Sequence, residues 1–168
     1  MRRTVRRRWL ERTRRPEQLR ARQLRADDGF SLIELMVVVL IISILVVIAM
    51  PVFAGARDRA ADKAAESNLR NALPAAVSYY VDTSSYDGFD PATGKAAEPS
   101  IDWVGAGPPN VGEVAIQVAS GPDLLLIALS RSGTYFCISQ IENSPQTGRG
   151  KDKNFNNINI IPNCTGGW

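Results

Sequence analysis

Few residues of this chain could do chemistry, and one of them is a carboxylate in an unusual place. Glu34 is the one charged residue in the apolar run over residues 30–50. A carboxylate inside a membrane helix costs about 2.5–3.5 kcal/mol on insertion scales, and such residues usually have a specific partner. The alternative is that Glu34 only extends to the lipid headgroups, as polar side chains near a helix end can. We expect a partner, because leucine would serve a plain anchor better.

The composition excludes the common catalytic and metal sites. The 168 residues include no histidine and two cysteines. Without imidazole there is no Ser-His-Asp or Cys-His nucleophile and no histidine metal ligand, and two cysteines cannot make a four-cysteine zinc site. Acids such as Asp82, Asp87, Asp90 and Asp102 lie in or beside an expected loop, where solvated charge is the default. We expect no enzyme activity, no catalytic residue, no metal and no cofactor.

The two cysteines, Cys137 and Cys164, bracket 26 mostly polar residues. In an exported chain this pattern is typical of a single disulfide. Closing a loop of about 28 residues would stabilise the fold by about 3.5 kcal/mol in the chain-entropy model. A free thiol pair and a metal site are the alternatives, and the lack of histidine and of a third cysteine disfavours both.

The element that carries Glu34 is long enough to cross a membrane. Twenty helical residues at about 1.5 Å each span roughly 30 Å, the thickness of a bilayer core. The run is too long for the ~7–15-residue apolar core of a secretory signal. Residues 1–28 contain eleven arginines and four acids, so the positive-inside rule predicts a cytoplasmic N-terminus and an external C-terminus. An ordinary signal anchor would show the same pattern.

The net charge of +3 comes from the N-terminal segment. Residues 1–28 carry +7, and residues 29–168, with nine basic and thirteen acidic side chains, carry −4. If the basic segment is removed, the remaining chain is acidic. An arginine-rich start could suggest nucleic acid, but the apolar run directly behind it favours a role in membrane orientation, and nucleic-acid binding stays unknown.

The residues around Glu34 resemble the N-terminus of type IV prepilins. That family has a hydrophilic leader ending in glycine, a phenylalanine as first mature residue, a Thr/Ser-Leu-Ile-Glu-Leu run and an apolar helix with a proline about three heptads along. This chain has Gly29, Phe30, the run Ser31-Leu32-Ile33-Glu34-Leu35 and Pro51. The match is close over residues 28–56. The leader is long, and two acids, Asp27 and Asp28, stand where a basic residue often precedes the glycine.

The resemblance implies that a prepilin peptidase cuts between Gly29 and Phe30 on the cytoplasmic side and that the same enzyme class N-methylates Phe30. Cleavage would leave a new ammonium four residues from Glu34. We expect this ammonium to pair with Glu34 of a neighbouring copy, because an unpaired buried carboxylate costs several kcal/mol. Such a pair would set axial register, as a polar core residue does in a coiled coil.

Pro51 lies inside the expected helix. Proline removes one backbone donor and clashes with the preceding turn, which predicts a kink or local melting. The alternative is that the membrane helix ends at Pro51. The resemblance implies melting near this proline on assembly, and it also implies a disulfide loop near the C-terminus.

Four segments follow from these features. We expect a cleaved leader over residues 1–29, a transmembrane and assembly helix over 30–53, an amphipathic helix over 54–82, and a loop plus sheet with the disulfide loop over 83–168. The amphipathic helix has small and apolar residues at three- and four-residue steps, with Pro74 expected to interrupt it. Lys63–Glu66 and Glu66–Arg70 are spaced to pair on its surface.

Strand-like runs predict strands at 101–104, 113–119, 124–130 and 134–140. Residues 82–100 and 142–157 are predicted loops, and residues 158–161 a short edge strand. The expected fold is α+β and pilin-like: a long N-terminal membrane-spanning helix continues into a helix packed against an antiparallel sheet.

The resemblance implies a structural subunit of a type IV pilus. Its partners would be other copies of itself, the prepilin peptidase, the pilus assembly platform and, before assembly, membrane lipid. It would first be a single-pass N-in/C-out precursor in the inner or cytoplasmic membrane, and then part of an extracellular pilus on the bacterial surface.

Two alternatives remain. One is a type II secretion pseudopilin or a minor pilin; major pseudopilins often hold calcium with acids of the C-terminal loop, and residues 143–168 contain one acid, Asp152. The other is a signal-anchored protein, or an extracellular protein released by signal peptidase. Ala54-Gly55-Ala56 matches a small-x-small cleavage pattern that would leave Arg57 as the first residue.

Overall fold

The computed structural model describes residues 29–141 and 147–168. The expected leader, apart from Gly29, and the start of the predicted loop 142–157 lie outside the described residues. The described residues up to Ile44 form one unit, and those from Leu45 to Trp168 form a second.

One helix, α1 (Leu32–Thr83), has 52 residues and contains both Pro51 and Pro74. The helix does not end at Pro51, and the expected interruption at Pro74 is wrong. Pro74 is exposed, so water can bond the carbonyl that its missing N–H leaves free. Alanine and leucine, which are strong helix formers, flank Pro74 directly and help the helix to continue through it. A kink or melting at Pro51 stays a prediction.

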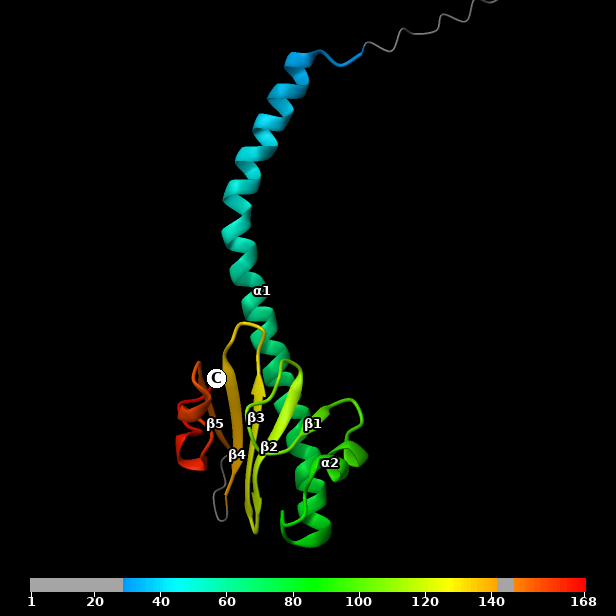
Figure 1. Ribbon diagram of the computed structural model, residues 1–168, viewed down its shortest axis with the longest axis vertical. Coiled ribbons are helices and arrows are strands. Elements are labelled where there is room, and N and C mark those ends of the chain that lie inside the picture. The colour runs from blue at the N-terminus through cyan, green and yellow to red at the C-terminus, as the bar shows by residue number, and fades with distance from the viewer. Residues whose placement is uncertain (1–28, 142–146) are drawn as a thin grey trace, which may run out of the picture. The chain divides into compact units, whose positions relative to one another are not determined.

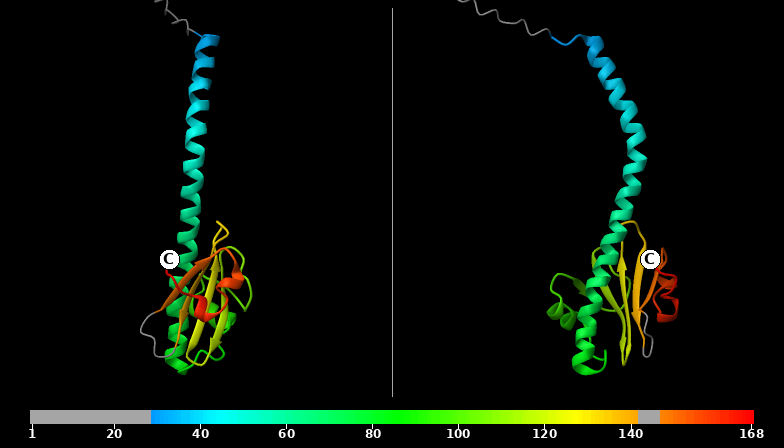
Figure 2. Two further views of the ribbon diagram at one scale, coloured as in Figure 1. Left: turned by 90° about the vertical axis from the view of Figure 1, so that its left-hand side faces the viewer. Right: turned by 180° about the vertical axis from the view of Figure 1, so that it is seen from behind.

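Five strands form one sheet beside the second half of α1 (Figures 1 and 2). They are β1 (Asp102–Val104), β2 (Glu113–Ser120), β3 (Asp123–Leu129), β4 (Tyr135–Gln140) and β5 (Gly148–Asp152), in the order β1-β2-β3-β4-β5. Strands β2 to β5 are antiparallel, whereas β1 pairs with β2 in parallel. The four strands predicted from the sequence are present, and the α+β, pilin-like class is confirmed, with a mostly antiparallel sheet.

Three local predictions are wrong. The predicted loop 82–100 contains a short helix, α2 (Pro91–Ala97), which starts with a reciprocal capping box between Asp90 and Thr93. The predicted loop 142–157 contains β5. Residues 158–161 form no strand, because the chain there turns through the 3₁₀ helices η1 (Phe155–Asn157) and η2 (Ile161–Asn163).

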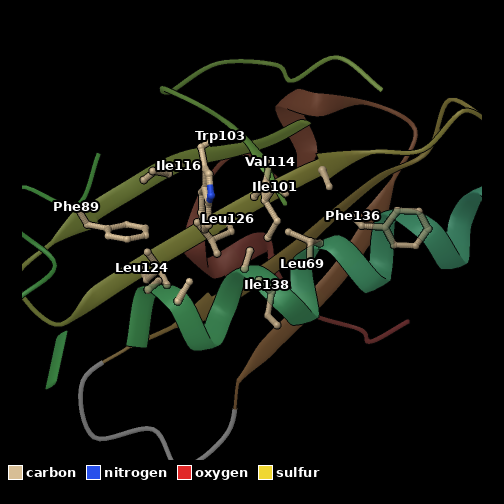
Figure 3. Close-up of a cluster of buried hydrophobic side chains, with 14 of the residues drawn as sticks. Leu69, Phe89, Ile101, Trp103, Val114, Ile116, Leu124, Leu126, Phe136 and Ile138 are labelled. Carbon is tan, nitrogen blue, oxygen red and sulfur yellow. The ribbon is translucent and has the colours of Figure 1, made fainter. Parts of the chain in front are cut away.

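The sheet is buried on both faces. Leu69 of α1 packs with Leu124, Leu126 and Ile138 on one face (Figure 3). The alternate residues of β3, such as Leu125 and Ile127, pack on the opposite face against the C-terminal turns, through buried apolar residues that include Ile158 and Cys164. Alternation along a strand sends neighbours to opposite faces, so a strand covered on both sides reads as the continuous apolar run of β3.

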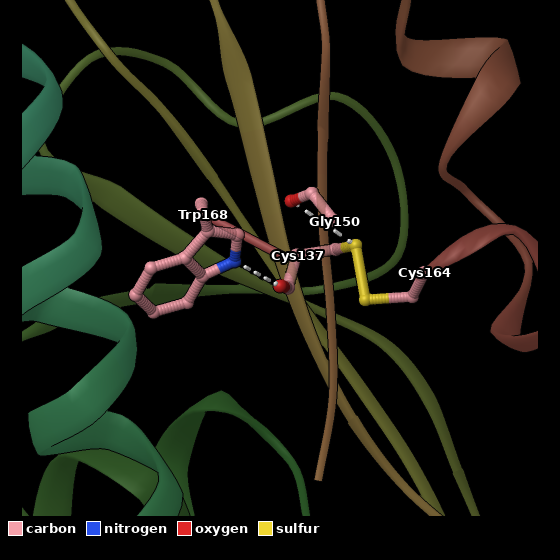
Figure 4. Close-up of a disulfide and its surroundings, with 4 residues drawn as sticks. All are labelled: Cys137, Gly150, Cys164 and Trp168. Carbon is pink, nitrogen blue, oxygen red and sulfur yellow. Dashed lines mark hydrogen bonds between the residues drawn. A yellow bond between two sulfur atoms is a disulfide. The ribbon is translucent and has the colours of Figure 1, made fainter. Parts of the chain in front are cut away.

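The C-terminal residues cross from one face of the sheet to the other. Cys137 of β4 and Cys164 form the expected disulfide, with their Cα atoms 5.8 Å apart, on the face away from α1. Trp168 packs on the face toward α1, and Figure 4 shows the indole and the disulfide on opposite sides of β4 and β5. Gly150 permits this crossing, because a Cβ there would stand 2.9 Å from the Thr165 carbonyl oxygen.

Candidate functional site

The bond expected to be cut lies just before α1. Gly29 and Phe30 have no regular secondary structure, and Phe30 is 86% exposed. A Cβ built on Gly29 would meet no atom within 4 Å. Among the described residues, nothing therefore blocks the access of an enzyme to the peptide bond between Gly29 and Phe30.

Glu34 has a partner within its own chain. The Ser31 backbone N–H donates to Glu34 Oε2 at 3.1 Å, and the Glu34 N–H donates to Ser31 Oγ at 3.3 Å. This reciprocal pair is a capping box, in which two otherwise unpaired donors at a helix start are satisfied together. The carboxylate in the first turn also lies at the positive end of the helix dipole.

The sequence interpretation named Ser31 in the motif but missed its role as the N-cap of α1. Ser-x-x-Glu before an apolar run is a known helix-start signal, and Ser31-Leu32-Ile33-Glu34 fits it. The capping box shows why a carboxylate is tolerated next to an apolar run.

The first half of α1 has no cover within the chain. Every described side chain from residue 32 to 53 is exposed, and the large apolar ones are 47–76% exposed. Ser43 satisfies its hydroxyl internally by donating to the Val39 carbonyl oxygen at 2.7 Å. Among the described residues, α1 alone is long and apolar enough to cross a membrane. Apart from the carbonyl that loses its donor at Pro51, the helical backbone and the Ser43 hydroxyl make the internal bonds that lipid requires.

The second half of α1 is tied to the sheet and its loops by polar contacts that the sequence did not reveal. The Ser132 hydroxyl donates to Asp62 Oδ1, and the Asn68 amide donates to the Gly112 carbonyl oxygen at 3.3 Å. As their sequence spacing predicts, both Lys63 and Arg70 pair with Glu66. The Lys63 Nζ lies 2.7 Å and an Arg70 guanidinium nitrogen 3.7 Å from Glu66 Oε2. The Glu66 side chain, however, is only 5% exposed, so this is not the surface pair that was expected.

Trp168 joins the helix to the last strand. Its indole N–H donates to the Cys137 carbonyl oxygen at 2.9 Å. The guanidinium carbons of Arg70 and Arg149 each lie 5.1 Å from the centre of its ring. Cations over an aromatic face are attracted to its π-electrons, so Trp168 holds an arginine from α1 and one from β5 in place.

Within residues 29–141 and 147–168, no three histidine, cysteine or acidic side chains come together as a metal-ligand set. Asp152, the single acid of the C-terminal segment in that part of the chain, accepts hydrogen bonds from the Asn154 N–H at 2.7 Å and from the Asn157 amide at 3.2 Å. Its carboxylate thus stabilises a turn of its own chain.

Comparison with known proteins finds a match for the N-terminal segment alone. A family model described as the prokaryotic N-terminal methylation motif matches residues 24–50. No curated protein and no solved structure matches the chain. The matched residues contain the Gly29–Phe30 bond, the Ser31–Glu34 capping box and most of the uncovered apolar part of α1. Residues 24–50 therefore carry the type IV pilin and prepilin signature, and this motif supports a type IV pilin-like or pseudopilin protein.

Proposed function

We propose that this chain is a structural subunit of a type IV pilus. A prepilin peptidase cuts it after Gly29 and methylates the nitrogen of Phe30. An assembly platform then moves the mature subunit from the membrane into a surface filament, where copies pack through the first half of α1. The precursor spans the cytoplasmic membrane once, with its N-terminus inside.

The observation that carries this proposal is the contrast between an uncovered apolar helix and a complete domain on one chain. Residues 32–53 present bulky apolar side chains and no buried face, whereas the sheet is covered on both faces. A helix that is apolar all round is stable only in lipid or among other helices. Lipid supplies that surrounding for the precursor, and neighbouring copies of α1 supply it in the filament.

Glu34 keeps an oxygen for a neighbour in this scheme. Its Oε2 accepts from the Ser31 N–H, and within the described residues Oε1 accepts no hydrogen bond. Cleavage turns the Phe30 nitrogen into an ammonium and leaves the Ser31 N–H in place, so the capping box survives. The free Oε1 can then accept the ammonium of an adjacent copy, which removes the cost of leaving a charge unpaired among apolar helices.

Pro51 and the disulfide have separate roles in the proposal. Pro51 weakens the helix locally, since it leaves one carbonyl of the preceding turn without a partner, and melting there would lengthen the subunit during assembly. The Cys137–Cys164 bond holds the C-terminal turns on the face of the sheet away from α1, where it stabilises the domain outside the cell.

Mass spectrometry of sheared surface material tests the proposal. The expected result is a mature chain that begins at N-methyl-Phe30, within filaments that contain this protein. A chain beginning at Arg57 would indicate a signal peptide, and an uncut chain kept on the cell would indicate an anchor. Correct processing without surface filaments, together with a secretion defect in a deletion strain, would instead indicate a pseudopilin.

A pair of variants tests the role of Glu34. Glu34→Val should still insert and be processed, but filament yield should fall by about tenfold or more, because the incoming ammonium loses its partner. Ser31→Ala is the matched control, since it removes one side of the capping box and leaves the carboxylate. Normal filament yield from Glu34→Val would exclude the pairing role.

A further inference from the structure

A groove lies between α1 and the end of the sheet, directly after the apolar run. It encloses about 590 Å³, a volume typical of sites that bind small molecules. Val111 and Leu129, joined by a β-bridge, line it on the side of the sheet. On the side of α1 it is lined mainly by small side chains, those of Ala54, Ala60, Ala61, Ala64 and Ala65. The small size of these alanines leaves the hollow open.

Two hydrogen bonds hold the walls of the groove in place. The Ser132 hydroxyl, in the turn between β3 and β4, donates to Asp62 Oδ1 of α1. The Asn68 amide donates to the Gly112 carbonyl oxygen at 3.3 Å. The turn between β3 and β4 accordingly lies beside α1 (Figure 1). The groove is thus formed without a ligand, which lowers the entropic cost of binding one.

The charged side chains of the groove suit an anion. Arg57 and Arg131 line it and are both exposed, and Asp58 is the one acid among the lining residues, so the lining has a net charge of +1. Within the described residues, neither arginine forms an ion pair. Guanidinium groups match the geometry of phosphate oxygens. The lining therefore combines an apolar surface with donors for a phosphate.

The position of the groove along α1 indicates where such an anion comes from. The helix continues unbroken from Met50 to Arg57, so its rise places residues 54–57 about 6–10 Å beyond the apolar run. The headgroup layer of a bilayer is about 5–8 Å thick on each side. Arg59 extends toward the same layer, because its Nη1 lies 3.7 Å from the position of a Cβ on Gly55. Arginines at a membrane interface reach for headgroups in this way.

We propose that this groove binds an anionic phospholipid of the outer leaflet while the subunit is still in the membrane. Arg57 and Arg131 bind the phosphate, and the wall formed by Val111 and Leu129 contacts the glycerol and the first methylene groups. A soluble anion would satisfy the arginines but leave that apolar wall in water. The inference rests on the proposed single-pass precursor and assigns a specific lipid site to it.

Photocrosslinking of the full chain in vesicles tests the site. The vesicles contain equal parts of phosphatidylglycerol and phosphatidylcholine, and one of the two lipids carries a photoreactive group at the start of an acyl chain. Mass spectrometry then measures crosslinks on the peptides that contain Val111 and Leu129, which belong neither to the leader nor to α1. Phosphatidylglycerol should label both peptides about fivefold more than phosphatidylcholine, as one extra cation near an anionic lipid provides.

Two double variants test the role of the arginines. Arg57→Gln with Arg131→Gln should lower phosphatidylglycerol labelling of both wall peptides by about tenfold or more, because both phosphate donors are lost. Lys151→Gln with Lys153→Gln removes two exposed charges outside the groove and should leave labelling within about twofold of wild type. Equal labelling of the two double variants would overturn the site.

A second pair of variants tests the hollow itself. Ala64→Leu fills the groove and should lower the labelling of the wall peptides by both lipids about fivefold or more, since a pocket that is filled excludes its ligand. Ser67→Leu adds a similar side chain at an exposed position of the same helix outside the groove, and should change nothing. Unchanged labelling of Ala64→Leu would overturn the proposal.

Competition and filament yield separate the lipid from other occupants. Soluble glycerol phosphate should not compete with the lipid, and full displacement by it would show a site for free anions instead. Groove variants that form fewer filaments but keep normal lipid labelling would show that a neighbouring copy occupies the groove. Either result would overturn the lipid site.

The labelling requires neither cleavage nor assembly, so its failure differs from a failure of the proposed function. Filaments of N-methyl-Phe30 chains, together with wall peptides that phosphatidylglycerol does not label, would overturn the lipid site alone. An uncut chain without filaments that still shows selective labelling would overturn the pilus proposal and leave the lipid site standing.

Discussion

The two halves of α1 share one backbone conformation and differ in side-chain size. Leucine, isoleucine and valine fill residues 32–53, all of them exposed. The buried positions of the second half are mainly alanine, with Leu69 as the one large apolar side chain among them. Small side chains let a rigid sheet approach the helix closely, whereas bulky ones suit fluid lipid or interdigitating helices. The side-chain sizes are thus those expected for a first half in lipid or among helices and a second half against the sheet.

The polar groups of the two halves differ in the same way. Ser31, just before α1, bonds with Glu34, and Ser43 bonds to the helix backbone, so none of the three needs a partner from elsewhere in the fold. In the second half, Asp62 and Asn68 bond to residues of the sheet and its loops. The first half is therefore satisfied without any partner, as a membrane requires, while the second half depends on the fold around it.

The largest expected effect comes from Leu69→Ala. Leu69 is fully buried, and removing such a side chain typically costs about 2–5 kcal/mol. Leu45→Ala, in the exposed half, should leave the stability of the domain unchanged. Urea unfolding of the mature protein in detergent micelles, followed through Trp103 and Trp168, measures both. Equal costs for the two leucines would break the distinction between the halves.

A charge should be excluded from one half and tolerated in the other. Val46→Asp places a carboxylate in the apolar run and should cost about 2.5–3.5 kcal/mol of insertion free energy. Ser67→Asp, on the exposed side of the second half, should cost less than about 0.5 kcal/mol of stability. For Val46→Asp, the readout is the fraction of precursor that resists extraction from membranes. For Ser67→Asp, it is the urea unfolding used for Leu69→Ala. Full insertion of Val46→Asp would mean that this half does not span the bilayer.

A smaller effect is expected at the start of the helix. Ser31→Ala removes the N-cap acceptor, which is worth about 1 kcal/mol, and should speed amide hydrogen exchange in the first turn. Ser31→Thr keeps the acceptor and should exchange like wild type. Ser78→Ala, inside the second half, serves as the matched loss of a hydroxyl. Unchanged exchange in Ser31→Ala would show that the capping box does not hold this turn.

The smallest expected effect is the loss of thermal stability at low pH. Hydrogen bonds lower the pKa of Asp87 and Asp90 below the ordinary value of 3.8, and that of Glu98 below 4.5. Groups with a lowered folded pKa contribute stability above their unfolded pKa and lose it as the pH falls through the folded value. The melting temperature of the domain should therefore decline below about pH 4. Asp90→Asn, which keeps a cap acceptor but does not titrate there, should show a smaller decline.

Much of the fold could be read from the sequence where one strong pattern dominates. The Gly29-to-Glu34 spacing and the apolar run indicated the signature that residues 24–50 carry. Strands β2, β3 and β4 lie within one residue of their predicted bounds, because their apolar residues are dense and turn residues flank them. The cysteine pair also formed as expected.

The sequence interpretation failed where tertiary contacts decide the structure. β5 reads Gly-Arg-Gly-Lys-Asp and has no apolar pattern, since Gly148 and Gly150 are required by the chain that crosses above them. Residues 158–161 have the apolar content of a strand, but Ile158 covers the sheet from a turn. α2 was missed because it is short and starts with proline, and the capping box at Asp90 specifies it.

The placement of the single cross-link has a mechanical consequence. The chain leaves α1 at Thr83, and Cys137–Cys164 joins β4 to the C-terminal turns on the face away from the helix. In the proposed filament, tension runs along α1 and reaches the sheet through side-chain packing and the chain near Thr83. The cross-link lies outside this load path. When a subunit is stretched, α1 or the contact between α1 and the sheet would therefore unfold first. The C-terminal turns would stay attached to β4 through the disulfide.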